Sequence, residues 1–276
     1  MTTATIPSTT PLAGAATTPP ASFWNTLGAE WSKVATLRST YLTLGLGLFL
    51  SVATTAVASV AMGATNTAWP EEFDPILFSM VGNVFALIVY SVFGVLAVSR
   101  EYSSGTIRLT LIATPARHKV LFAKLLLVTL TILAFGMLTT IAMFLVGQAL
   151  LGAYGFPTTT LAETDAQWVV LGLGATMPFF SIIGLALGVL LRSTAGGITT
   201  VLGLLWLPQI FGEFMPAWGQ EHIISLFPGS ALDSMTLGQM MSAPPYSAPP
   251  LAALLAATWL FAIVGAAYVA FQRRDA

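Results

Sequence analysis

The chain has 276 residues, of which 56% are hydrophobic and only 8% are charged, and its formal net charge is −1. Soluble domains carry about 25% charged residues, whereas several uncharged stretches here reach the roughly 20 residues that a helix needs to cross a bilayer. Within lipid every backbone polar group must be paired, so such stretches form helices, and they lack the alternating pattern of a transmembrane β-barrel. The composition therefore excludes a soluble protein and predicts an all-α integral membrane protein. The absence of Cys excludes disulfides and Cys nucleophiles.

The N-terminal region divides into a polar tail and an amphipathic helix. Residues 1–22 are rich in Thr, Pro and Ala and lack the basic region and apolar core of a secretory signal, so we expect a disordered cytoplasmic tail. At helical spacing, one apolar face of the next stretch is formed by Phe23, Leu27, Trp31, Val34 and Leu37. Glu30 borders this face. The pattern predicts a helix in the membrane interface, and an extension of the first span is the alternative.

Six long apolar stretches follow and predict six transmembrane helices in one membrane domain, residues 23–276. The predicted spans are residues 40–62, 76–98, 120–151, 168–191, 196–212 and 251–271. Between the fifth and the sixth, apolar patches alternate with Pro and Gly. This segment, residues 213–250, predicts short re-entrant helices on the outer side.

Individual residues predict where the spans begin and how they pack. Asp74 can cap the second span, with Pro75 at its first position, and Thr114 with Pro115 repeats this pattern before the third. Pro178 should kink the fourth span, and Pro208 should leave the fifth short or broken. In the fourth span, Gly184 and Gly188 form a small-residue pair suited to close helix contact.

The basic residues indicate the topology. With the N-terminus in the cytoplasm and six spans, all ten Lys and Arg lie on the cytoplasmic side, five of them in the loop of residues 99–124. The segments on the outer side then hold eight acidic residues and no base. Five or seven spans would place Arg273 and Arg274 outside. The sequence therefore predicts that both termini are cytoplasmic.

The sequence contains few residues suited to catalysis. No Lys precedes Ser or Thr, so a phosphate-binding P-loop is excluded, and any ATP must be bound by another polypeptide. The topology places His118 and His222 on opposite faces of the membrane, which excludes a metal site that they share. No ionisable residue lies deep in a span, and Glu213 at the outer end of the fifth is the nearest. No feature indicates a nucleic-acid partner.

The loop between the second and third spans holds the largest group of polar residues. Ser103 or Ser104 could cap a short helix that runs to Ala113, although the alternating pattern there would equally suit an extended segment. In a helix, Glu101 and Arg108 would share a face. These charges either form a docking surface for a soluble partner or only set the topology and solvate the loop.

The residues of this loop resemble a known family. EYSSGTIRLTLIATPARHKVLFAKLL is similar to the cytoplasmic segment between the second and third spans of type-2 ABC transporter permeases, particularly those of the actinobacterial type. EWSKVATLRSTY resembles the interfacial helix of that family, and FPGSALDSM resembles its outer segment. The resemblance covers nearly the whole chain apart from the first twenty or so residues.

The resemblance implies a non-catalytic permease subunit in a bacterial cell membrane. Two permease copies would pack with two separate ATP-binding cassette subunits, which would bind ATP and Mg²⁺, so that this chain needs no cofactor. The loop of residues 99–119 would dock on the ATPase through Glu101, Gly105, Thr106, Ile107 and Arg108. The cargo would be an amphipathic small molecule or a lipid-like molecule moved outward, in contact with membrane lipid. An ion-gradient-driven carrier, a membrane-embedded enzyme and an assembly factor are the alternatives.

Overall fold

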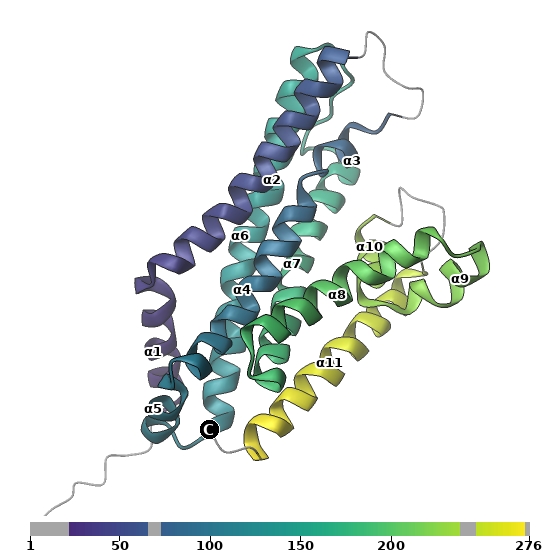
Figure 1. The fold of residues 1–276 in the computed structure, drawn as a ribbon. Coiled ribbons are helices and arrows are strands. Elements are labelled where there is room, and N and C mark those ends of the chain that lie inside the picture. Colours follow the sequence, from purple (N-terminus) through teal and green to yellow (C-terminus); the bar gives the residue numbers. More distant parts are fainter. Residues whose placement is uncertain (1–21, 66–72, 238–246, 274–276) are drawn as a thin grey trace, which may run out of the picture.

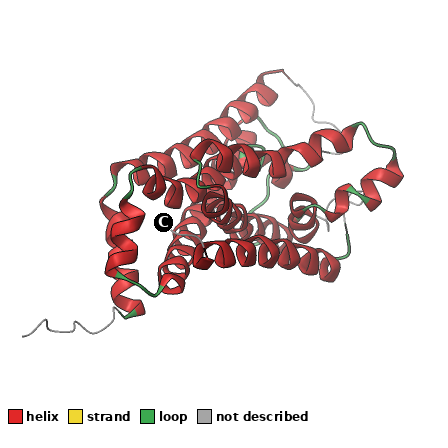
Figure 2. Ribbon diagram, turned by 60° about the horizontal axis from the view of Figure 1, so that its bottom comes forward, coloured by secondary structure: helices red, strands yellow, loops and turns green. Residues whose placement is uncertain are grey.

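The computed structural model describes residues 22–65, 73–237 and 247–273 (Figure 1). Within these ranges all regular structure is helical (Figure 2). The elements are α1 (Phe23–Thr36), α2 (Arg38–Thr65), α3 (Pro75–Ser79), α4 (Asn83–Ser103), α5 (Thr106–Ala113), α6 (Arg117–Ala153), α7 (Thr164–Leu191), α8 (Thr194–Glu213), α9 (Ala217–His222), η1 (Ile224–Leu226), α10 (Pro228–Thr236) and α11 (Pro249–Arg273). Apart from Ser22, which caps α1, the predicted tail lies outside the described residues.

Six of these helices are long and apolar enough to cross a membrane, namely α2, α4, α6, α7, α8 and α11. They confirm the predicted six-span, all-helical, multi-pass architecture. The start of α1, the whole of α5 and the end of α11 lie at one end of the bundle, which we call the α5 end (Figure 1). The side chain of Arg117, at the start of α6, donates hydrogen bonds to the carbonyl groups of Phe271 and Gln272 and so fixes the end of α11 there.

Helix α7 is the centre of the bundle. Of the residues in the apolar 18-residue segment of α7, 67% are buried. The corresponding share for α11, at the periphery, is 17%. Its closest contact is with α4, where a Cβ atom on Gly94 would overlap the carbonyl group of Ser181, and a Cβ on Gly184 would overlap that of Ser91. Small residues let two helices approach closely within lipid. The structure therefore confirms the packing role predicted for Gly184 and Gly188, since a Cβ on Gly188 would lie 2.7 Å from a Val98 side chain.

The second predicted span is interrupted near its start. Asp74 accepts hydrogen bonds from two backbone amides of α3, as expected of an N-cap, but α3 ends after five residues and α4 begins only at Asn83. The break packs against α2, where the Thr55 hydroxyl donates to the Ser79 carbonyl and accepts from the Gly82 amide. These bonds satisfy backbone groups that the break frees, which is why an interruption is tolerated here.

Two helices of the bundle, α7 and α8, continue through an internal proline. The fifth span is neither short nor broken, because α8 runs for 20 residues through Pro208. Pro178 lies inside the continuous helix α7, and the kink expected there stays a prediction. Between α8 and α11 the structure confirms short helices, α9 and α10, and their re-entry into the membrane stays a prediction.

Helix α1 is a separate helix, not an extension of the first span, because Leu37 is extended and α2 begins at Arg38. Its apolar side faces outward: 74% of Trp24 and 56% of Trp31 are exposed. Its polar side faces the bundle, and Thr26 and Glu30 are both buried. Outward aromatic rings on an amphipathic helix favour the predicted position at the membrane interface, where such rings contact lipid.

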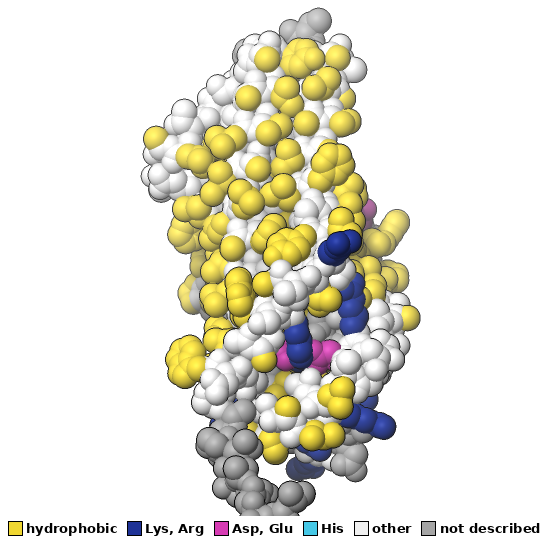
Figure 3. All heavy atoms as spheres, turned by 90° about the vertical axis from the view of Figure 1, so that its left-hand side faces the viewer, with side chains coloured by type: hydrophobic (Ala, Val, Ile, Leu, Met, Phe, Trp, Pro, Cys, Tyr) yellow, Lys and Arg dark blue, Asp and Glu magenta, His cyan; other side chains and the backbone are white. Residues whose placement is uncertain are grey.

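The basic side chains of the described residues are concentrated at the α5 end. On the face formed by α1 and α2, dark-blue bases and magenta acids gather near α5, whereas hydrophobic side chains cover the rest (Figure 3). Arg192, the last basic residue before α8, also belongs to this end, since it lies 5.3 Å from the Tyr102 ring of α4. The predicted grouping of the bases at one end is confirmed for the described residues, and a cytoplasmic position of that end stays a prediction.

Candidate functional site

The segment between α4 and α6 forms a short helix set between two turns. Gly105 occupies the left-handed region with φ 71° and is the N-cap of α5, so neither Ser103 nor Ser104 caps the helix as we expected. The segment is helical and not extended. Because α4 ends at Ser103 and α5 begins at Thr106, Glu101 and Arg108 lie in different helices and do not share one helix face as predicted. Thr114 ends α5 instead of starting the third span.

Helix α6 begins at Arg117 without a side-chain cap, which corrects the start predicted from Thr114 and Pro115. The first four amide groups of a helix have no partner within the helix. Here two of these groups have backbone partners, because the Arg117 amide donates to the Pro115 carbonyl and the Lys119 amide donates to the Ala116 carbonyl.

Helix α5 is anchored to the bundle on one side and open on the other. Ile107 is buried in the hydrophobic core, whereas the side chains of Arg108, Leu109 and Ile112 are exposed. Of the five predicted contact residues, Gly105, Thr106 and Arg108 are accessible. Ile107 is inside, and the side chain of Glu101 is 12% exposed. Helix α5 thus presents basic and apolar side chains outward and is held in place by the buried side chain of Ile107. A soluble protein can dock on a surface of this kind.

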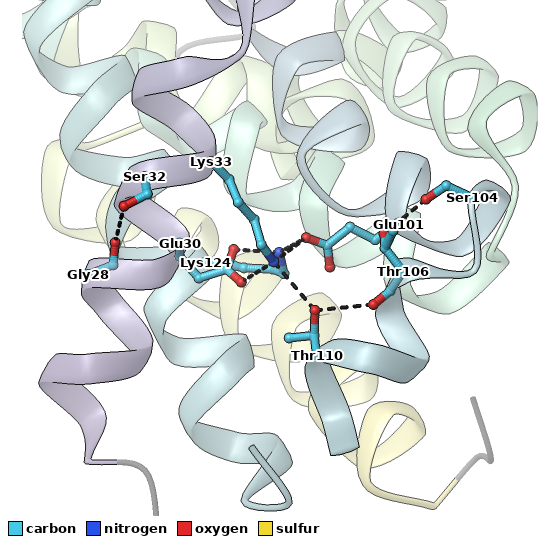
Figure 4. Close-up of polar contacts among 9 residues, drawn as sticks. All are labelled: Gly28, Glu30, Ser32, Lys33, Glu101, Ser104, Thr106, Thr110 and Lys124. Atoms are coloured by element: carbon cyan, nitrogen blue, oxygen red, sulfur yellow. Dashed lines mark hydrogen bonds and ion pairs between the residues drawn. The ribbon is translucent and has the colours of Figure 1, made fainter. Parts of the chain in front are cut away.

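Four charged side chains from three helices meet beside α5. Lys124 of α6 contacts Oε2 of Glu30 in α1 and Oε1 of Glu101 in α4, each at 2.6 Å. Lys33 of α1 contacts the same two carboxylates at 2.7 and 2.8 Å. Each lysine therefore bridges both acids (Figure 4). We call these four residues the ionic cluster.

The ionic cluster also reaches α5. The ammonium group of Lys33 donates to the Thr110 hydroxyl at 3.4 Å, and Thr110 lies in the middle of α5 (Figure 4). Side-chain exposure is 4% for Lys124 and 5% for Glu30, so these two charges are removed from water. Buried charges of equal number and opposite sign compensate one another. The cluster thus links α1, α4, α5 and α6 at one point.

The protonation of Lys33 reflects this environment. Burial disfavours its ammonium group, but hydrogen bonds and ion pairs with Glu101 and Glu30 outweigh burial and raise the pKa of Lys33 above its ordinary value. A raised pKa stabilises the folded state below the ordinary lysine pKa, and this contribution is lost as the pH rises through the raised value. Over the neutral range the interaction is therefore fully present.

Sequence reasoning identified Glu101 but missed its partners Glu30, Lys33 and Lys124. The sequence places Lys124 among the bases of residues 99–124, and the structure places its side chain inside the bundle. One signal was available: a lysine eight residues into a long apolar helix needs a carboxylate partner, and Glu30 beside an apolar face needs a base. The sequence does not show that Lys124 and Glu30 pair with each other.

The turn before α5 gives a testable prediction. Gly105→Ala places a side chain in the left-handed region, and we expect it to lower the free energy of unfolding by about 1 kcal/mol. Gly28→Ala is the matched control, because Gly28 lies inside α1 with no atom within 4 Å of the added Cβ. It should be neutral or stabilising. Thermal unfolding in detergent measures both, and equal stability of the two variants would contradict the role of Gly105.

Comparison with known proteins identifies the family. A family model described as ABC-2 family transporter protein matches residues 26–205. The chain belongs to the ABC-2 transporter family. The comparison with curated proteins found no match.

The match begins in α1 and ends in α8, so it includes α5 and the whole ionic cluster. It confirms the resemblance drawn from the loop and from EWSKVATLRSTY, whereas FPGSALDSM lies beyond the matched region. An ABC-2 permease is the membrane component of an ABC transporter and associates with an ATP-binding cassette subunit. For an ABC-2 permease, an exposed surface at one end of the spans is therefore a candidate contact for that subunit.

Proposed function

We propose that the chain is the permease subunit of an exporter that moves an amphipathic small molecule or a lipid-like molecule outward. A separate ATP-binding cassette subunit docks on residues 99–119 and binds the ATP and Mg²⁺. Two copies of the permease, or this permease and a homologous one, form the membrane part within a bacterial cell membrane. The observation that supports this proposal is the exposed surface of α5, anchored to three other helices.

The mechanism follows from how α5 is attached. The exposed residues Thr106, Arg108 and Ile112 contact the ATPase, while Ile107 and the Thr110–Lys33 hydrogen bond hold α5 against the bundle. When ATP binding brings the two ATP-binding cassette subunits together, α5 is displaced. This displacement is transmitted to α1, α4 and α6 together, because the ionic cluster joins these helices. A short helix fixed in this way transmits force better than a flexible loop would.

The docking surface is tested by charge reversal. Arg108→Glu should reduce co-purification of the ATPase with the permease by about tenfold or more, since reversing one charge in an interface juxtaposes like charges. Arg273→Glu is the matched control: it reverses an exposed base at the same end of the bundle, on α11. Membrane insertion of both variants should equal that of the wild type. Undiminished binding of the ATPase by Arg108→Glu would contradict the assignment.

Reconstitution into vesicles separates the proposal from an ion-gradient carrier. The exporter should require ATP and its ATPase subunit and should continue in the presence of an uncoupler. A carrier should stop with the uncoupler, ignore ATP and depend on Glu213. Transport that follows the second pattern would overturn the proposed function.

A further inference from the structure

A cavity of about 420 Å³ lies at the opposite end of the bundle from α5. It is enclosed by the first turns of α4, the middle of α7, the last turns of α8, and α10, which lies beside α8 (Figure 1). Small organic ligands bind in cavities of about 300–1,000 Å³. No residue of the ionic cluster lines this cavity, so it is a separate feature.

The polar groups of the cavity all carry oxygen acceptors, and none is basic. Among the described residues that line it, the ionisable side chains are Glu213 of α8 and Asp233 of α10. The amides of Asn83 and Gln209 lie with them. Most of the remaining wall is hydrophobic and includes the aromatic rings of Phe180 and Trp206. The described wall therefore holds two carboxylates, of which that of Glu213 is exposed, and no Lys, Arg or His.

Two of these polar groups lack adequate partners. The Oδ1 atom of Asn83 is buried and accepts no hydrogen bond. The carboxylate of Asp233 accepts a long hydrogen bond, 3.4 Å, from Nε2 of Gln209. Burial raises the pKa of Asp233 to about 6, and the bond from Gln209 lowers it only in part. A carboxylate in such surroundings is stabilised by a positive charge that the cavity wall does not provide.

We propose that this cavity binds a monovalent organic cation with an apolar body. Asp233 and Glu213 supply the opposite charge, and Trp206 contacts the cation and its apolar part. An inorganic metal ion fits less well, because the described residues contain no group of three His, Asp or Glu side chains able to hold one. That the cation is the exported cargo rests on the proposed function, whereas its binding does not.

Equilibrium binding to the purified protein, in detergent and with its native partners, tests this proposal. The probes are tetraphenylphosphonium and tetraphenylborate, which have nearly the same size and shape and opposite charge. We expect the cation to bind about tenfold more tightly than the anion, or better, since the charged side chains of the described cavity wall are both acidic. Equal affinities would show a merely hydrophobic site and would overturn the proposal.

Conservative variants then locate the site. Asp233→Asn should weaken tetraphenylphosphonium binding by about tenfold, a loss typical of removing a charge from a binding site, and Glu213→Gln should weaken it less because Glu213 is exposed. Asp165→Asn, which neutralises an exposed acid in the first turn of α7, is the control and should bind as the wild type does. Two variants on different helices keep the test valid if one fails to fold. Unchanged affinity in a folded Asp233→Asn or Glu213→Gln would overturn the proposal.

The pH dependence adds a readout that a structural role would not produce. Asp233 is ionised only above its pKa of about 6, so wild-type affinity for tetraphenylphosphonium should rise between about pH 5 and pH 7. Glu213 is the other ionisable group of the described wall. Asp233→Asn should flatten the profile. A profile unchanged by that variant would contradict the proposal.

Transport assays distinguish failure of this inference from failure of the proposed function. ATP-driven export of another amphipathic compound, without charge-selective binding of tetraphenylphosphonium, would support the proposed exporter function and overturn the cavity proposal. Charge-selective binding that depends on Asp233, without any ATP-driven transport, would support the cavity as a cation site and overturn the proposed function.

Discussion

Lys124→Met is expected to lower the free energy of unfolding by about 3–5 kcal/mol, the cost typical of removing one partner from a buried ion pair. Lys124 lies between Glu30 and Glu101, at 2.6 Å from each. Without its ammonium group, both carboxylates depend on Lys33 alone, whose side chain is 38% exposed. Two acids near one base in a poorly hydrated site repel each other, so the loss exceeds that of a surface pair.

Thermal unfolding in detergent measures this effect, and the midpoint should fall by roughly 10 °C. Lys119→Met is the matched control, because it makes the same change five residues earlier in α6 at a more exposed position. Lys119 is only partly buried and lies outside the ionic cluster, so its substitution should lower stability less than Lys124→Met does. If both variants unfold at the wild-type temperature, the ionic cluster does not stabilise the fold.

A double-mutant cycle shows whether the loss comes from the pairing itself. Glu30→Gln removes the acid on α1, and its combination with Lys124→Met removes both charges of the buried pair. The double variant should cost less than the sum of the two single variants, with a coupling energy of about 1–3 kcal/mol. Additive losses would mean that each residue stabilises the protein through other contacts.

Gly94→Ala is expected to destabilise the protein by about 3 kcal/mol, the upper part of the range for added volume in a packed core. The new Cβ would overlap the carbonyl group of Ser181 at the closest approach of α4 and α7. Backbone atoms cannot move aside as a flexible side chain can. The two helices must therefore separate, and the Ser181 hydroxyl loses its hydrogen bond to the Tyr90 carbonyl.

Gly45→Ala makes the matched comparison. Gly45 lies inside α2, and a Cβ there has no neighbour within 4 Å. Since Ala favours helix more than Gly by about 1 kcal/mol, this variant should be as stable as the wild type or more stable. Resistance of the two variants to thermal unfolding should therefore change in opposite directions. A Gly94→Ala protein as stable as Gly45→Ala would contradict the close packing of α4 and α7.

The spans could be predicted because their signal is local. A run of about 20 apolar residues forms a helix in lipid whatever its neighbours are, and all six predicted spans are helices in the structure. The break after Ser79 was missed for the opposite reason. It is tolerated because Thr55 bonds the freed backbone groups, and Thr55 lies in another helix.

The candidate site was predicted only in part. The sequence indicated the loop between the second and third spans, and the family match includes this loop. It did not show that Glu101 turns inward to a pair of lysines while Arg108, Leu109 and Ile112 face outward. The direction of each side chain depends on the turn at Gly105, since this turn separates α4 from α5 and so changes which residues share a face.

The sequence by itself determined the membrane class, the six spans, the grouping of bases at one end and the family. Each of these depends on composition or on neighbours along the chain. Only the tertiary structure decided that Glu30 pairs with Lys124, 94 residues away, that α1 turns its polar side inward, and that Asn83, Glu213 and Asp233 line one cavity. The physical reason is that a charge inside a bundle needs a partner, but helix packing alone determines which residue comes within reach.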